Sequence, residues 1–376
     1  MTRANERLPR PRLLPVGRVE HGGPDFAELL TLGIRPDAVL DFSVNKNPLG
    51  ASPRALRALD LVDISVYPDT RCLRLRAALA AAHGCQERQV LAGNGSVELI
   101  WLLAQTYLQP GDTVLILGPT FGEYEAAARR AGAEVVQIDA REDDGFRPDL
   151  ASICETIRRL QPRLVFLCNP NNPTGQVLEP ADVQQILAAL GDGLLLVDEA
   201  YIELADGVKS VEPWRAADPR LVILRSLTKS HGLAGLRLGY LLADAEIVQA
   251  VAQAQPPWSV NAYAQAAGIA ALGDEEHVQD GRRLARLARA YLIDGLERLG
   301  LACVPTRASF WLVRVGDGQL VRSELLRRGI LVRNAQSFGL PVYIRVAVRP
   351  LEECERLLTV LTGLLSSGVL ESDKVT

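Results

Sequence analysis

The chain has 376 residues, of which 48% are hydrophobic and 23% charged, and its formal net charge is −4 at pH 7. It is long enough for a large and a smaller domain, and its acidic balance argues against nucleic acid as the main partner. The six cysteines form no C-x-x-C pair and no metal-like cluster with the four histidines, so we expect no metal site. Residues 1–20 lack a signal-type apolar segment and no apolar run is long enough to span a membrane, so the expected location is the cytoplasm, with no membrane partner.

The first part of the chain is predicted to be an arm followed by short elements. Residues 1–20, rich in Arg and Pro, form the expected loosely attached arm. The sequence Asn45-Lys-Asn-Pro-Leu-Gly50 predicts a loop, because Asn, Pro and Gly favour turns. The regular patterns are helical at 25–32, 53–59 and 72–83 and strand-like at 39–42.

From residue 91 onward, short apolar runs alternate with helical patterns. The strand-like runs are the start of 91–96, then 113–117, 134–138, 164–168, 194–197 and 221–224; the helical patterns are 97–108, 124–131, 149–160 and 181–190. Apolar strands that alternate with helices are typical of an α/β fold with a mainly parallel sheet covered on both faces. Ligands of such sheets bind at the carboxyl ends of the strands.

The last third of the chain has a different pattern. Two strand-like segments with one polar face are flanked by helical patterns, the helices at 262–272, 277–299, 320–328 and 352–365 and the strands at 310–315 and 343–348. We therefore expect a smaller α+β C-terminal domain after the Pro256–Val260 break. The predicted division is an arm and part of the small domain in 1–45, a large domain in 46–258, and the small domain in 259–376.

The first candidate catalytic segment begins at Ser226 and continues to Tyr240. Lys229 leaves a buried strand among hydroxyl groups, where a lysine is placed to lose its proton and form a Schiff base with a carbonyl cofactor. Ser226, Thr228 and Arg237 are candidate ligands of a phosphate. The alternative is a solvated loop lysine.

Three further segments follow apolar strands. Gly93-Asn-Gly-Ser96 opens a helix whose free amides suit a phosphate, although such glycines also serve tight packing. Asn169–Gly175 contains two Asn-Pro steps that close a rigid turn. Asp198 ends an apolar strand, where a carboxylate needs a positive partner unless it is a helix cap.

Together these segments resemble the pyridoxal-phosphate (PLP) enzymes of the aspartate aminotransferase type, the class I and II aminotransferases of fold type I. Their lysine motif is S-x-[ST]-K-(x7)-R-x-G, which matches Ser226 to Gly239. The resemblance implies PLP on Lys229, with Asp198 at the protonated pyridine nitrogen, which keeps the ring an electron sink. It also implies that Asn172 and Tyr201 contact the phenolic oxygen of the cofactor.

The resemblance assigns other residues to the cofactor as well. The predicted phosphate ligands come from two segments: Gly95, Ser96, Val97, Ser226, Thr228 and Arg237. Phe121 is expected to stack on the pyridine ring, the alternative being a core position. Tyr67, in a Tyr-Pro turn, is expected to reach the neighbouring subunit's site, which implies a homodimer with shared active sites; the alternative is a local turn tyrosine.

Two branches of this family resemble the chain, and both act on small phosphorylated amines or amino acids. Four segments favour L-threonine O-3-phosphate decarboxylases: His21–Gly23, Asp41–Gly50, Pro257–Asn261 and Ile344–Arg349. The prediction is therefore PLP-dependent decarboxylation of L-threonine O-3-phosphate to aminopropanol phosphate, a precursor of a cobalamin-type side chain. The alternative is a histidinol-phosphate aminotransferase, with transfer to 2-oxoglutarate, or a related class I/II aminotransferase.

The substrate is predicted to be held by charged and polar residues from both ends of the chain. Arg345 lies in an alternating strand, and its fork suits a carboxylate, as the resemblance also implies. Arg333, His21 and Asn45 are expected to hold the phosphate, unless Arg333 forms a surface salt bridge and His21 is a loop residue. A dehydrogenase is disfavoured because no G-x-G-x-x-G follows the first strands. A DNA-binding regulator is disfavoured because too few residues precede His21 for a helix-turn-helix module.

Overall fold

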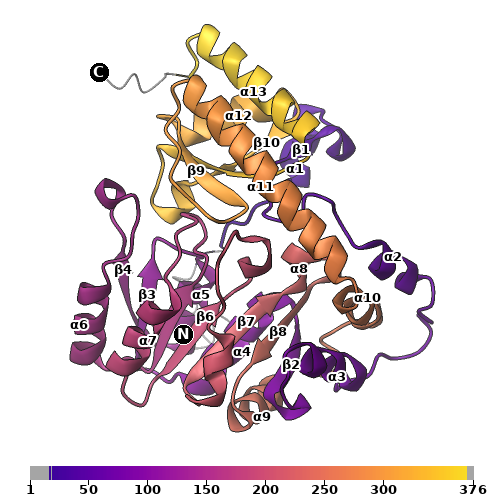
Figure 1. The fold of residues 1–376 in the computed structure, drawn as a ribbon, viewed down its shortest axis with the longest axis vertical. Coiled ribbons are helices and arrows are strands. Elements are labelled where there is room, and N and C mark those ends of the chain that lie inside the picture. The colour runs from indigo at the N-terminus through magenta and orange to yellow at the C-terminus, as the bar shows by residue number, and fades with distance from the viewer. Residues whose placement is uncertain (1–16, 18, 371–376) are drawn as a thin grey trace, which may run out of the picture.

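The computed structural model describes residue 17 and residues 19–370, so the predicted arm lies mostly outside the described residues. Its larger part is built on a seven-stranded sheet with the order β2-β8-β7-β6-β5-β3-β4 (Figure 1). The strands are β2 (Val90–Asn94), β3 (Thr113–Gly118), β4 (Glu134–Asp139), β5 (Leu164–Cys168), β6 (Leu194–Asp198), β7 (Leu221–Ser226) and β8 (Leu238–Leu242). Neighbouring strands are parallel except where β8 runs antiparallel to both β2 and β7. The predicted mainly parallel sheet is confirmed.

Helices cover both faces of this sheet, because alternate residues of each strand point to opposite sides. In β6, Leu195 and Val197 join one apolar core, and Leu194 and Leu196 join the other. The first core is closed by α3 (Leu73–Ala82), α6 (Leu150–Leu160), α7 (Pro180–Ala189) and α10 (Ala262–Leu272). The second is closed by α4 (Gly95–Tyr107), α5 (Glu123–Ala131) and α9 (Ala245–Ala254). Asp198 is even-numbered like Leu194 and Leu196, so it faces the α4–α5 side of the sheet.

A third core belongs to the smaller part of the molecule, drawn above the large sheet in Figure 1. It contains an antiparallel sheet of order β11-β12-β9 and a two-stranded parallel pair, β1 with β10. These elements are β1 (Leu40–Asp41), β9 (Phe310–Arg314), β10 (Ile330–Leu331), β11 (Arg333–Asn334) and β12 (Tyr343–Ala347), with α1 (Phe26–Leu32), α11 (Glu275–Arg298), α12 (Gly318–Leu326) and α13 (Leu351–Ser366). Phe42 is buried in this core, so the segment around β1 packs with the small part.

Two predictions need correction. The boundary expected after residue 258 lies too early, because α10 packs against α2 (Pro53–Leu59) and α3 and its alanines lie in the first core. A proline-rich break indicates an interruption of the chain, not which core the next helix joins. The sequence analysis also missed β8, whose pattern is interrupted by Gly239. A Cβ at Gly239 would lie 2.5 Å from the Ser96 backbone nitrogen, so this close approach requires glycine.

Among the described residues, no helix combines the length and the apolar character needed to cross a membrane.

Candidate active site

The candidate active site is a cavity of about 670 Å³ between the carboxyl ends of β5, β6 and β7 and the sheet of the small part. Most residues predicted for the site line this cavity: His21, Asn45, Ser96, Val97, Phe121, Asn172, Asp198, Tyr201, Thr228, Lys229, Arg237, Arg333 and Arg345. Gly95 and Ser226 lie directly behind its wall, and Tyr67 lies outside it. Segments more than three hundred residues apart in the sequence therefore meet at one place.

Lys229 projects into this cavity from α8 (Leu227–Ser230), which begins directly after β7. Removal from water, together with the charges of Arg345 and Arg237, lowers the pKa of its amine to about 8, and Asp198 opposes this shift. The Lys229 Nζ lies 5.7 Å from the centre of the Tyr201 ring. This half-buried lysine is therefore not a solvated loop residue, and an appreciable fraction of its amine is neutral near pH 7 to 8.

Asp198 ends β6 in a buried position. Its Oδ2 accepts a hydrogen bond of 2.7 Å from the Tyr124 hydroxyl, and its Oδ1 accepts one of 3.0 Å from the Ala200 amide. Burial raises the pKa of Asp198 to about 6, and these two hydrogen bonds oppose the rise. Asp198 caps no described helix, so the alternative of a helix cap is wrong.

Tyr124 was not predicted as a site residue. Its ring stacks on Phe166 at a centroid distance of 4.9 Å and meets the edge of Phe121 at 5.6 Å, so its hydroxyl is held toward Asp198. The only signal in the sequence was its place in the segment Pro119–Tyr124, next to the aromatic residue that was selected.

A group of donors converges at the start of α4. Gly95 has a φ of 76°, and a Cβ there would lie 2.6 Å from Arg237 Nη2, so only glycine lets the guanidinium come this close. Asn94 gives the helix no side-chain cap, which leaves its first amides for another acceptor. The Ser226 and Thr228 hydroxyls, 2.6 Å apart, complete the group. Amides at a helix start, hydroxyls and a guanidinium together fit a phosphate ester.

The Asn-Pro loop connects the large sheet to the small part. Asn172 Oδ1 accepts a hydrogen bond from Arg345 Nη1, while Asn169 is bonded in both directions to the backbone of Leu178. Arg345 Nη2 also donates to the Ser43 carbonyl at 2.5 Å. Its buried Nε makes no hydrogen bond to any described residue, and the same holds for the buried side-chain amide of Asn45. These unpartnered polar atoms line the cavity and indicate a polar ligand.

Arg333 and His21, predicted to hold a phosphate with Asn45, both have carboxylate partners in the structure. Arg333 Nη1 lies 3.2 Å from Glu20 Oε2, and His21 Nε2 lies 2.9 Å from Glu123 Oε1. Arg333 is 7% exposed and Glu20 is largely exposed, so the salt bridge named as the alternative is present but joins a buried guanidinium to a carboxylate at the surface. Glu123 also accepts a hydrogen bond of 2.7 Å from the Trp101 ring nitrogen.

Tyr67 makes no contribution to the cavity of its own chain. It is 78% exposed and stacks on Trp258 at a centroid distance of 4.9 Å. Several apolar neighbours are exposed as well, namely Leu61, Ile64 and Val66. A role for Tyr67 at a cofactor requires a second chain and stays a prediction.

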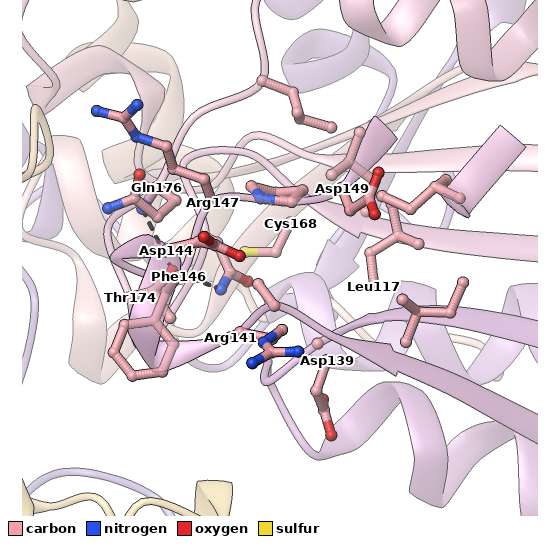
Figure 2. A pocket seen from close by; sticks show the side chains of 18 of the residues that line it. Leu117, Asp139, Arg141, Asp144, Phe146, Arg147, Asp149, Cys168, Thr174 and Gln176 are labelled. Atoms are coloured by element: carbon pink, nitrogen blue, oxygen red, sulfur yellow. Dashed lines mark hydrogen bonds between the residues drawn. The ribbon is translucent and has the colours of Figure 1, made fainter. Parts of the chain in front are cut away.

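A second, smaller cavity of about 180 Å³ lies behind the end of β5 (Figure 2). Its lining includes Cys168, which also lines the candidate active site, and several charged residues of the 139–149 segment. The Cys168 thiol donates to the Pro170 carbonyl at 3.3 Å, and burial raises its pKa well above the ordinary range. Cys168 is therefore a packed, unreactive wall between the two cavities.

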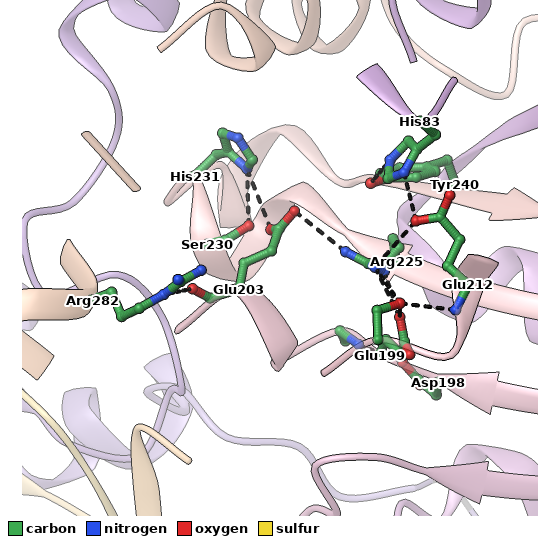
Figure 3. Close-up of polar contacts among 12 residues, drawn as sticks. His83, Asp198, Glu199, Glu203, Glu212, Arg225, Ser230, His231, Tyr240 and Arg282 are labelled. Atoms are coloured by element: carbon green, nitrogen blue, oxygen red, sulfur yellow. Dashed lines mark hydrogen bonds and ion pairs between the residues drawn. The ribbon is translucent and has the colours of Figure 1, made fainter. Parts of the chain in front are cut away.

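A buried polar network supports the catalytic strands from the opposite face of the sheet (Figure 3). Arg225 precedes Ser226 and pairs with Glu199, which follows Asp198, at 2.8 Å. Glu212 links Arg225 at 3.5 Å to His83 at 2.8 Å. Sequence analysis missed this network, because its members are separated along the chain. Among the residues that the structure covers, no cluster of His, Cys, Asp and Glu is arranged to hold a metal ion.

The amino-acid sequence matches known proteins over most of its length. Residues 37–361 match the family model described as aminotransferase class I and II. A histidinol-phosphate aminotransferase of Symbiobacterium thermophilum is 41% identical over 328 residues, which cover 86% of this chain and 90% of that protein.

Two solved structures have the same fold. A histidinol-phosphate aminotransferase of Sinorhizobium meliloti in complex with pyridoxal-5'-phosphate has a TM-score of 0.86 and 25% identity, covering 98% of this chain and 100% of that one. An L-threonine-O-3-phosphate decarboxylase of Porphyromonas gingivalis has a TM-score of 0.76 and 27% identity, covering 86% of this chain and 99% of that one.

Proposed function

Because the chain belongs to the class I and II aminotransferases, which are pyridoxal-phosphate enzymes, we propose that it transfers the amino group of histidinol phosphate to 2-oxoglutarate. One observation carries the choice of substrate class. Two buried arginines, Arg333 and Arg345, line the cavity that also contains Lys229. Such a pair suits substrates that carry a phosphate or a carboxylate close to the reacting amine.

The residues present fit the cofactor at three points. Gly95, Ser226, Thr228 and Arg237 form a cradle for its phosphate, which a Cβ at Gly95 would fill. Phe121 offers an aromatic face, and Asp198 offers a buried carboxylate to a protonated ring nitrogen. When bound, PLP supplies an electron sink for the bonds at the substrate's amino carbon.

Residues of this chain then move a proton and orient the substrate. The neutral form of Lys229, favoured by the lowered pKa, can take a proton at its Nζ from the substrate's amino carbon and return it. Arg345 and Arg333 fix the anionic group of each substrate, so that histidinol phosphate and glutamate are oriented by the same charges. Asn172 belongs to the Asn-Pro loop, and its hydrogen bond with Arg345 connects that loop to the arginines that bind the anionic group.

The second candidate function is the decarboxylation of L-threonine phosphate, which four segments of the sequence favoured. His21, on which that reading partly depended, is engaged by Glu123, and the relative at 41% identity is a histidinol-phosphate aminotransferase. The threonine-phosphate decarboxylase is a structural neighbour at 27% identity. Comparison therefore supports the aminotransferase alternative over the main prediction.

One assay separates the two candidates. The PLP-loaded protein is incubated with histidinol phosphate and 2-oxoglutarate, and separately with L-threonine phosphate, and glutamate and carbon dioxide are measured. We expect glutamate in the first mixture and no carbon dioxide above background in the second. Carbon dioxide without glutamate would support the decarboxylase instead. If neither product formed, both candidate functions would be excluded.

A further inference from the structure

The N-terminal segment Glu20–Gly22 lines one wall of the active-site cavity and is fixed in place. The Gly23 amide donates to Ser43 Oγ at 2.8 Å, and a Cβ at Gly22 would lie 2.4 Å from the Ser43 carbonyl oxygen. On the other side, His21 pairs with Glu123 at 2.9 Å. These contacts hold the three residues that directly follow Glu20, so they give the Glu20 backbone a defined position.

Glu20 occupies the open side of Arg333. Its Oε2 lies 3.2 Å from Arg333 Nη1, and its backbone oxygen accepts from Arg333 Nη2 at 3.1 Å. Ser337 Oγ accepts from the same nitrogen at 2.5 Å. The Arg333 side chain is 8% exposed and that of Glu20 is 64% exposed, so the carboxylate reaches a buried guanidinium from the solvent.

The neighbouring Arg345 is treated differently. Its guanidinium donates hydrogen bonds to the neutral oxygens of Asn172 and Ser43, and it forms no ion pair with a carboxylate of the described residues. The charge of Arg333 is thus neutralised by Glu20, whereas that of Arg345 is not. An anion entering the cavity meets Arg345 directly but must compete with Glu20 for Arg333.

We propose that Glu20 is a specificity-determining residue: an internal counterion of Arg333 that favours dianionic phosphate groups over monoanions. A phosphate dianion has more charge than a carboxylate and three acceptor oxygens, so it can engage both arginines and replace the Glu20 carboxylate. A monocarboxylate offers Arg333 no more than Glu20 does. The identity of the substrate rests on the proposed function, but the competition at Arg333 does not.

The test measures binding rather than turnover. The PLP-loaded protein is titrated calorimetrically with inorganic phosphate and, separately, with acetate. In Glu20→Gln we expect the Kd for phosphate to fall by about fivefold, as expected for removal of a partly exposed ion pair. The Kd for acetate should fall by a larger factor, so the preference for phosphate narrows. Glu20→Asp keeps the charge on a shorter side chain and should lie between Glu20→Gln and the wild type.

Two matched variants show whether the effect passes through Arg333. Glu125→Gln removes the same charge from another carboxylate–arginine pair, with Arg129, outside the cavity, and should leave both Kd values unchanged. In an Arg333→Met background, the effect of Glu20→Gln should disappear. Unchanged or weaker phosphate binding in Glu20→Gln would overturn the proposal, as would a gain for phosphate at least as large as that for acetate. An equal gain in Glu125→Gln, or a gain that persists without Arg333, would overturn it too. None of these outcomes depends on which reaction the enzyme catalyses.

Discussion

Arg333 and Arg345 are direct register partners on the antiparallel strands β11 and β12, and both side chains are buried. Burial, followed by the charge of Arg333, lowers the pKa of the Arg345 guanidinium to about 10, against an opposing effect of Tyr201. Two like charges opposite one another are unfavourable, and Glu20 offsets the charge of Arg333 alone. The pair is thus placed for ligand binding and not for stability.

Replacing either arginine should therefore reduce substrate use far more than stability. In Arg345→Met we expect kcat/KM for histidinol phosphate to fall on the order of a hundredfold or more, as for loss of a desolvated charge partner. The urea midpoint should stay close to that of the wild type, because a repulsion is removed with the charge. Arg129→Met, at an exposed arginine outside the cavity, is the control for kcat/KM. A variant with near-normal kcat/KM would contradict the assignment.

Lys229 should make the cofactor-free protein more stable as the pH rises. Its folded pKa of about 8 lies below the ordinary 10.5, so between these values the unfolded chain binds more protons than the folded one. The free energy of unfolding should accordingly increase through this window, relative to Lys229→Met, by about 1–3 kcal/mol. Urea titrations at pH 7.5, 9 and 10.5 measure the difference. Lys209→Met, at an exposed lysine, is the control, and an equal slope in both variants would sink the idea.

The Tyr124 hydroxyl should set the lower pH limit of activity. It donates to Asp198, and this hydrogen bond opposes the rise in pKa that burial causes. In Tyr124→Phe the pKa of Asp198 should rise above about 6, so the acid limb of kcat/KM should move upward by about one pH unit. Profiles from pH 5 to 8 check this, with Tyr291→Phe as control. An unmoved acid limb would show that Asp198 does not control it.

The buried Arg225–Glu199 pair should matter for stability. Arg225→Met leaves Glu199, whose side chain is fully buried, without its cation, and should lower the free energy of unfolding by about 3–5 kcal/mol. Combining it with Glu199→Gln should recover part of this loss, because the second charge is removed too. Arg129→Met breaks an exposed pair and should cost less than about 0.5 kcal/mol. Equal losses in Arg225→Met and Arg129→Met would contradict the argument.

Tyr67 should act in trans if the protein is a homodimer with shared sites. It is exposed and outside its own cavity, next to exposed apolar residues. Mixing inactive Lys229→Ala chains with weakened Tyr67→Phe chains should restore activity above either parent, because hybrid dimers contain one intact site. Sedimentation of the wild type as a monomer, or a mixture no more active than its parents, would end this prediction.

Much of the fold and the cofactor site was determined by local sequence. Continuous apolar runs such as Leu164–Cys168 and Leu194–Val197 specify buried strands, and the chemistry-bearing residues follow directly at their ends. Because parallel strands end at the same edge of a sheet, Asn172, Asp198 and Lys229 had to meet there. Their order along the chain was enough to predict the cavity that contains them.

The contacts that tune the site were decided only by tertiary structure. Glu20 and Arg333 are 313 positions apart, and Tyr124 and Asp198 are 74 positions apart, so no local periodicity records either pair. The same is true of the joining of α10 to the large core and of the buried partners of Arg225. Such contacts depend on how whole elements pack. The pKa of a side chain and the strength of its ion pairs depend on its burial and on neighbouring charges, which the sequence alone does not specify.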